Sequence, residues 1–263
     1  MTQMPEPNDE PDDAMDREVD KDLDDHLDEI ADEGEVPAEI RSRLALALDV
    51  DDIVAARRLA FDLEPFFGTV KVGLELFCAT GTDTVSGFAG AGFDVFCDLK
   101  LHDIPTTVEK AARVVGSLGA RWLTVHTQGG GDMLRAAVAG AAAGAEGVGL
   151  QPPGILGVTV LTSDATADRS ELERRTTLAV ESGCAGIICA ATDLEATAPW
   201  ADRLVRVVPG TRLPGADAHD QARVTTPIEA IEGGADLLVV GRAVTAAEEP
   251  ILAAVELVGH MLG

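Results

Sequence analysis

An acid, a base and a second acid stand close together in the segment Asp98-Leu99-Lys100-Leu101-His102-Asp103. The segment follows an apolar run that ends at Cys97 and is typical of a strand. Because residues two apart in a strand project to the same side, we predict that Asp98 and Lys100 point together from the strand's end, with Asp103 in the loop beyond. Between two carboxylates the Lys100 ammonium is expected to stay protonated, so it can act as a general acid and stabilise a developing carbanion. If the pattern were only Asp-x-Lys, without the second acid, we would interpret it as an ion pair on the protein surface.

Two further charged residues extend this array. Lys71 lies inside the apolar run Val70-Lys71-Val72-Gly73, and a buried lysine is rarely retained without a partner. Asp49 follows the run that ends at Leu48, where a simple helix cap remains an alternative role. If Asp49, Lys71, Asp98 and Lys100 share one cavity, each lysine keeps its neighbouring carboxylates ionised.

Glycine and arginine at the last strand signals indicate an anion site. Gly241 and Arg242 directly follow Val239-Val240, so backbone amides can approach a ligand beside a fixed cation. Arg212 and Gln221 lie beyond the preceding strand signal. In barrels of alternating strands and helices, phosphate often binds at the loops after strands seven and eight. An ordinary turn is the alternative for a lone Gly-Arg.

Eight short apolar runs, each followed by a stretch of helical length, are predicted to position these residues. Eight even repeats in about 220 residues favour a closed (β/α)8 TIM barrel, and a doubly wound open sheet is the alternative. The active site of such a barrel lies at the carboxyl ends of its strands. The predicted strands cover 44–50, 70–77, 95–99, 122–126, 155–161, 186–189, 204–208 and 237–240, and the predicted helices 52–66, 82–91, 106–118, 131–143, 171–182, 192–200, 226–233 and 246–261.

Composition supports one α/β domain with an acidic extension. Of 263 residues, 46% are hydrophobic but only 3% aromatic, so the core must be built from Ala, Val, Leu and Ile, which suits buried parallel strands. The net charge of −26 is concentrated at the start of the chain. We therefore predict an acidic, disordered extension over residues 1–42 and a barrel domain over residues 43–263. The excess of acids excludes a nucleic-acid binder.

The cysteines and apolar windows point to a cytoplasmic protein. The four cysteines show no metal-ligand spacing and read as small core residues. No secretory signal and no uninterrupted apolar span occur, so no membrane association is expected. Neither a metal-binding grouping nor a Gly-x-Gly-x-x-Gly loop is present, so no cofactor is indicated.

In their order along the chain, these motifs resemble the orotidine 5′-phosphate decarboxylase family in its bacterial form. The likeness covers roughly residues 43–260. It implies a homodimeric (β/α)8 barrel that converts orotidine 5′-monophosphate to UMP and CO2 without a cofactor. It is carried by Leu46-Ala47-Leu48-Asp49, Lys71-Val72-Gly73, the segment from Asp98 to Val108, Val158-Thr159-Val160-Leu161-Thr162-Ser163, Pro209-Gly210-Thr211-Arg212, Asp220-Gln221-Ala222-Arg223 and Val240-Gly241-Arg242-Ala243-Val244-Thr245.

The resemblance also implies a role for each matching residue. Lys100 would protonate C6 of the pyrimidine beside Asp98, with Lys71 in the same charge array. The remaining roles are ribose binding by Asp49, contact with the pyrimidine by Thr162 or Ser163, phosphate binding by Arg212, Gln221, Gly241 and Arg242, and a reach into the neighbouring subunit's site by Asp103, Ile104 and Thr107.

Two alternatives remain at this point. Enzymes of the same superfamily that act on sugar phosphates with Mg²⁺ share the Asp-x-Lys-x-x-Asp pattern, but they usually carry an acid where this chain has Lys71. A catalytically silent barrel whose acidic arm recruits a partner is the other. Intact Asp98, Lys100, Asp103 and Arg242 argue against it.

Overall fold

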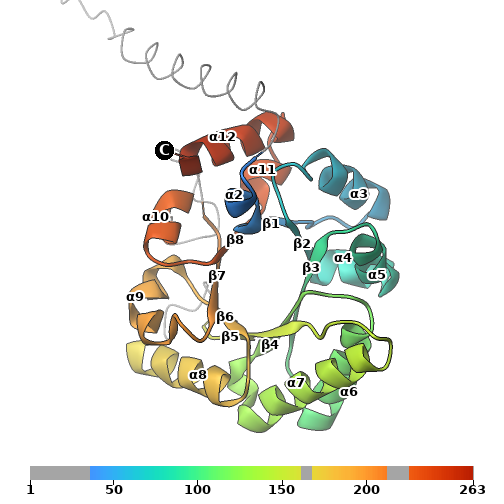
Figure 1. The fold of residues 1–263 in the computed structure, drawn as a ribbon, viewed down its shortest axis with the longest axis vertical. Helices are drawn as coiled ribbons and strands as arrows, with labels where there is room; N and C mark the ends of the chain where they lie inside the picture. Colours follow the sequence, from blue (N-terminus) through green and yellow to red (C-terminus); the bar gives the residue numbers. More distant parts are fainter. Residues whose placement is uncertain (1–35, 161–167, 212–224, 263) are drawn as a thin grey trace, which may run out of the picture. The chain divides into compact units, whose positions relative to one another are not determined.

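The structure, a computed structural model, describes residues 36–160, 168–211 and 225–262. Within these ranges eight parallel strands close into a barrel in chain order, because β1 pairs with both β2 and β8 (Figure 1). The predicted (β/α)8 barrel is confirmed, and the open-sheet alternative is wrong because it would leave two strand edges unpaired. The strands are β1 Leu44–Ala47, β2 Thr69–Gly73, β3 Asp94–Leu101, β4 Trp122–His126, β5 Gly154–Val158, β6 Gly186–Ile188, β7 Val205–Pro209 and β8 Leu237–Val240.

Helices surround this barrel and alternate with its strands (Figure 1). The first described helix, α2, lies within the range predicted to belong to the extension, so the described helical structure includes residues before 43. The helices are α2 Ala38–Ser42, α3 Ile53–Asp62, α4 Leu74–Thr80, α5 Asp83–Gly90, α6 Pro105–Gly116, α7 Gly131–Glu146, α8 Arg169–Glu181, α9 Leu194–Thr197, α10 Pro227–Glu232, α11 Arg242–Thr245 and α12 Pro250–Leu262, with 3-10 turns η1 Thr127–Gly129, η2 Ala191–Asp193 and η3 Ala198–Trp200. None of them is both long and apolar enough to cross a membrane.

Alternate strand residues fill the interior of the barrel. The buried cluster at its centre consists of Ala45, Ala47, Phe96, Leu156, Val207, Leu237 and Val239. Lys71 pairs with Ala47 on one side and Phe96 on the other, and neighbours across parallel strands face the same way, so Lys71 also points inward. The next inward position along β3 is Asp98. The alternation of side chains along β2 and β3 therefore places charged residues at the mouth of the barrel.

The strand predicted over 70–77 extends too far, and the one predicted over 44–50 ends earlier, at Ala47. Residues 74–77 were expected to continue β2, but they form the start of α4, in which only Leu76 is buried. A short apolar run does not distinguish a strand from a helix by its periodicity, and here the change occurs at Gly73. A Cβ atom at Gly73 would lie 3.0 Å from both the Asp49 Oδ1 and Lys71 Nζ atoms, so this position stays open for the charged side chains.

Candidate active site

Four charged side chains, on or just after three neighbouring strands, meet at the carboxyl end of the barrel. The Lys71 Nζ atom lies 2.9 Å from Asp49 Oδ1 and 3.8 Å from Asp98 Oδ2. The Lys100 Nζ atom lies 2.7 Å from the same Asp98 oxygen. The four groups thus form a chain of alternating charge with no net charge. The structure brings together all four residues of the predicted array.

The two inner groups of this array are more buried than the two outer ones. The side chains of Lys71 and Asp98 are 9% and 14% exposed, whereas those of Lys100 and Asp49 are 34% and 54% exposed. Removing a charge from water is costly unless an opposite charge and hydrogen bonds compensate it. Lys71 and Asp98 therefore depend on their partners, while Lys100 and Asp49 keep capacity to contact a ligand.

The backbone of β3 is irregular where it carries Lys100. The register against β4 shifts between Cys97 and Leu101: four steps along β3 face the two steps from Leu123 to Val125. Lys100 has a φ of 48°, and it is the one described residue other than glycine with positive φ. A left-handed conformation costs an ordinary side chain about 1–2 kcal/mol. Asp98 and Lys100 do meet as predicted, but through this bulge and not through a regular pleat.

These groups line one cavity of about 410 Å³, within the range typical of small-molecule sites. Its charged wall comes from β1, β2 and β3, and from Gly241 and Arg242 after β8. Its other wall is mostly apolar. That wall includes Val158, Val160, Ile188 and Pro209, from the ends of β5, β6 and β7. The predicted charge array and two of the predicted anion-binding residues therefore share one pocket.

Comparison with known proteins assigns this barrel to a family. The model of the "Orotidine 5'-phosphate decarboxylase / HUMPS family" matches residues 42–257. An orotidine 5′-phosphate decarboxylase of Anaeromyxobacter dehalogenans is 45% identical over 223 residues, which is 81% of this chain and 95% of that protein. The chain belongs to the orotidine 5′-phosphate decarboxylase / HUMPS family. It is an enzyme of this family, as the motif order predicted.

Further relatives agree. An orotidine 5′-phosphate decarboxylase of Paramagnetospirillum magneticum is 42% identical over 220 residues, covering 80% of this chain and 94% of that protein. Among solved structures, orotidine 5′-phosphate decarboxylase from Lactobacillus acidophilus superposes with a TM-score of 0.72 at 31% identity, covering 84% of this chain and all of that chain.

Three predicted residues in the loop after β3 and the first turn of α6 do not line the chain's own cavity. Asp103, Ile104 and Thr107 are exposed, and Ile104 has 66% of its surface accessible. The Asp103 carboxylate accepts a hydrogen bond from the Ile104 amide at 2.7 Å, which turns the chain into α6. Four other predicted residues, Thr162, Ser163, Arg212 and Gln221, lie outside the described part of the chain.

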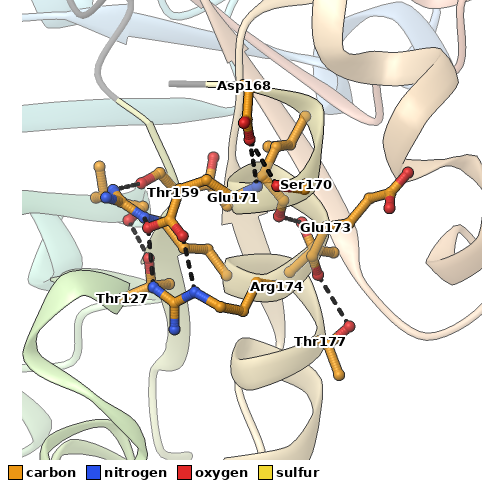
Figure 2. A network of polar contacts seen from close by, with 12 residues as sticks. Thr127, Thr159, Asp168, Ser170, Glu171, Glu173, Arg174 and Thr177 are labelled. Atoms are coloured by element: carbon orange, nitrogen blue, oxygen red, sulfur yellow. Dashed lines mark hydrogen bonds and ion pairs between the residues drawn. The ribbon is translucent and has the colours of Figure 1, made fainter. Parts of the chain in front are cut away.

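Sequence reasoning missed a polar network that fixes the end of β5. Arg175 of α8 donates to the Thr159 carbonyl and pairs with Glu171 at 2.5 Å. Arg174 pairs with the same carboxylate (Figure 2). Hydrogen bonds from Arg174 and then Arg175 lower the pKa of Glu171 to about 2. The network holds backbone between Val158 and Val160, two residues of the apolar wall. Only the folded chain reveals it, because α8 and β5 are brought together by packing.

His126 ends β4 beside this charged wall. Burial lowers its pKa, and the nearby His102, Lys100 and Arg175 lower it further, while Asp98 acts in the opposite direction. Its ring lies 5.4 Å from that of His102, and its buried Nδ1 atom has no hydrogen-bond partner among the described residues. His126 is therefore neutral at pH 7.

The lowered pKa of His126 predicts a loss of stability in mild acid. The unfolded chain binds this proton near pH 6.5, and the folded chain binds it only at lower pH. Folding stability therefore carries no penalty from His126 above pH 6.5 and falls as the pH drops below it. We expect an NMR titration midpoint below 6.5, and a smaller drop in Tm between pH 7.5 and 5.5 for His126→Gln than for the wild type. A midpoint at or above 6.5 would contradict this.

Neither a thiol nucleophile nor a metal ligand set is found among the described residues of this site. Burial, and then Asp98, raise the pKa of Cys97 to about 12, so this thiol stays protonated and is no nucleophile. In residues 36–160, 168–211 and 225–262, no group of three or more His, Cys, Asp or Glu side chains is arranged to hold a metal ion. Among the described residues, the ionisable groups that line the cavity are the carboxylates and ammonium groups of the array and the Arg242 guanidinium.

Proposed function

We propose that this protein converts orotidine 5′-monophosphate to UMP and CO2, without a cofactor, as a step of pyrimidine biosynthesis. The observation that carries the proposal is the interleaved array of Asp49, Lys71, Asp98 and Lys100 in one cavity that also contains Arg242. An anionic substrate can place its phosphate at Arg242 and its reacting carbon at Lys100. Membership of the family supports the same reaction.

The chemical step follows from the positions of Asp98 and Lys100. The bond from C6 to the carboxylate breaks, CO2 leaves, and the electron pair stays on C6. The Lys100 ammonium stabilises that carbanion and then transfers a proton from Nζ to C6, which gives UMP and a neutral amine that solvent reprotonates. No bond to the protein forms at any stage.

Asp98 and Lys71 set the field in which this step occurs. The substrate carboxylate next to Asp98 is repelled more strongly than the transition state, in which its charge has moved to C6. Lys71 contacts both Asp98 and Asp49, so its ammonium group lies between the two carboxylates and partly balances their charge. Asp49 is half exposed at the rim, where we assign it the ribose hydroxyl groups.

Remote binding energy is assigned to the phosphate end. Gly241 and Arg242 line the cavity, and we propose that they bind phosphate together with Arg212 and Gln221. Thr162 or Ser163 would contact the pyrimidine. The free energy of phosphate binding can drive closure of the site around the base, so that phosphate binding raises the rate as well as the affinity.

We also propose a homodimer in which each site is completed by the neighbouring subunit. The support is the exposure of Asp103, Ile104 and Thr107, which lie outside their own cavity although they continue the reactive motif. An exposed isoleucine beside two polar groups suits an interface with a second copy of the chain. In this arrangement Asp103 of the partner subunit joins the charge array.

A cytoplasmic location is proposed on the state of the cysteines. Cys78, Cys97, Cys184 and Cys189 are all free thiols. Unpaired cysteines are typical of a reducing compartment.

Turnover of orotidine 5′-monophosphate by the purified protein tests the reaction. The ultraviolet absorbance of the substrate is expected to change to that of UMP, at the same rate with and without EDTA. Orotidine, which lacks the phosphate, serves as the matched substrate and is expected to react with a much lower kcat/KM. Absence of turnover would refute the proposal. Loss of activity in EDTA that Mg²⁺ restores would favour the sugar-phosphate alternative.

A further inference from the structure

Thr124 lies directly behind the charged array. It belongs to β4, it is fully buried, and it does not line the cavity. It sits between Leu123 and Val125, which are the two residues that face the bulge in β3. The side chain therefore contacts the array from outside the cavity.

The hydroxyl group of Thr124 connects both halves of the Asp-x-Lys pair. Its oxygen accepts a hydrogen bond from the Lys100 backbone amide at 2.8 Å and donates to Asp98 Oδ1 at 3.0 Å. The Cys97 carbonyl, 3.4 Å away, is a more distant acceptor for the same proton. Asp98 Oδ2 then receives the Lys100 ammonium at 2.7 Å. One hydroxyl thus fixes a carboxylate on one side and a lysine backbone on the other.

The bulge makes this hydroxyl necessary. In a regular ladder, the amide of a strand residue donates to a carbonyl of the neighbouring strand, but the extra residues of β3 leave the Lys100 amide out of register with β4. A buried amide without an acceptor is strongly disfavoured, and Lys100 also holds a left-handed backbone conformation. The Thr124 side chain supplies the acceptor that the ladder does not.

We propose that Thr124 is a positioning residue, whose hydroxyl holds the Lys100 backbone and the Asp98 carboxylate in the geometry for proton transfer to substrate. This inference rests on the proposed function of Lys100 and Asp98. A misplacement of about 1 Å in a reacting group can lower a rate on the order of 100-fold. Loss of the hydroxyl therefore affects the chemical step more than binding.

Thr124→Val tests this, because valine keeps the shape and removes both hydrogen bonds. We expect kcat to fall roughly 10- to 100-fold while KM and the Kd for UMP change by less than about threefold. Thr124→Ser, which keeps the hydroxyl, is expected to restore kcat to within about threefold of the wild type. Thr176→Val is the matched control, since Thr176 is equally buried and donates only to the Leu172 carbonyl within α8.

The outcomes separate a positioning role from a structural one. A kcat of Thr124→Val near that of the wild type would overturn the proposal, as would an equal loss in Thr124→Ser or a parallel rise in the Kd for UMP. If the wild-type chain does not decarboxylate orotidine 5′-monophosphate, the proposed function fails. The positioning role of Thr124 is then tested by crystal structures of the wild type and Thr124→Val. Displacement of Lys100 and Asp98 in the variant supports the proposal, and unchanged positions overturn it.

Discussion

Lys100→Ala is expected to lower kcat by roughly 10⁴-fold or more, because in the proposed mechanism one group supplies both the charge that stabilises the carbanion and the proton that quenches it. The barrel is expected to stay folded. The Lys100 side chain is a third exposed, and Asp98 keeps Lys71 at 3.8 Å and the Thr124 hydroxyl at 3.0 Å. Alanine also accepts the backbone conformation no worse than lysine does.

Lys110→Ala is the control for the removal of a lysine. Lys110 is exposed on α6, outside the cavity, and its loss is expected to leave kcat and KM unchanged. Steady-state decarboxylation and thermal unfolding of both variants give the comparison. Activity of Lys100→Ala close to that of Lys110→Ala would remove Lys100 from the mechanism.

Mixing two inactive variants is expected to restore activity if the loop of Asp103 completes a neighbouring site. Asp103→Ala keeps Lys100, and Lys100→Ala keeps Asp103, so a dimer of one chain of each has one site with both groups. Random exchange makes half of the dimers mixed, and about a quarter of the wild-type activity is expected to return. The measurement is the decarboxylation rate after the two proteins exchange subunits, with the dimer verified by sedimentation.

A second mixture shows whether recovery comes from shared sites. Asp98 and Lys100 belong to the same chain's cavity, with their charged atoms 2.7 Å apart. Mixing Asp98→Asn with Lys100→Ala therefore leaves a defect in every site and is expected to restore nothing. A monomeric protein, or no recovery in the first mixture, would contradict the interface proposal.

The charge array could be predicted because its position depends only on residues within or next to each strand. Asp49 and Asp98 each stand just beyond the carboxyl end of an apolar run, Lys71 interrupts another such run, and a closed parallel barrel brings the ends of its strands to one rim. The alternation of strand residues then selects the inward-facing side. Each step needs only the strand's own residues and the order of the strands.

Thr124 could not be predicted in the same way. Its function depends on the register between β3 and β4 and on two extra residues in the bulge, which no periodicity reveals. For Arg175 the missing information is the approach of α8 to the end of β5. The helix Leu74–Thr80 was missed for a different reason, because an apolar run of that length fits a strand equally well.

The cavity wall has a charged part and an apolar part, which lie on different strands of the barrel. The ionic groups lie on or just after the consecutive strands β8, β1, β2 and β3, whereas Val158, Val160, Ile188 and Pro209, at the ends of β5 to β7, contribute shape without charge. If the proposed mechanism holds, substitutions on the apolar arc can alter which base fits, while the residues assigned to proton transfer stay unchanged across the barrel. Substrate preference and reaction type can thus evolve on separate segments of the gene.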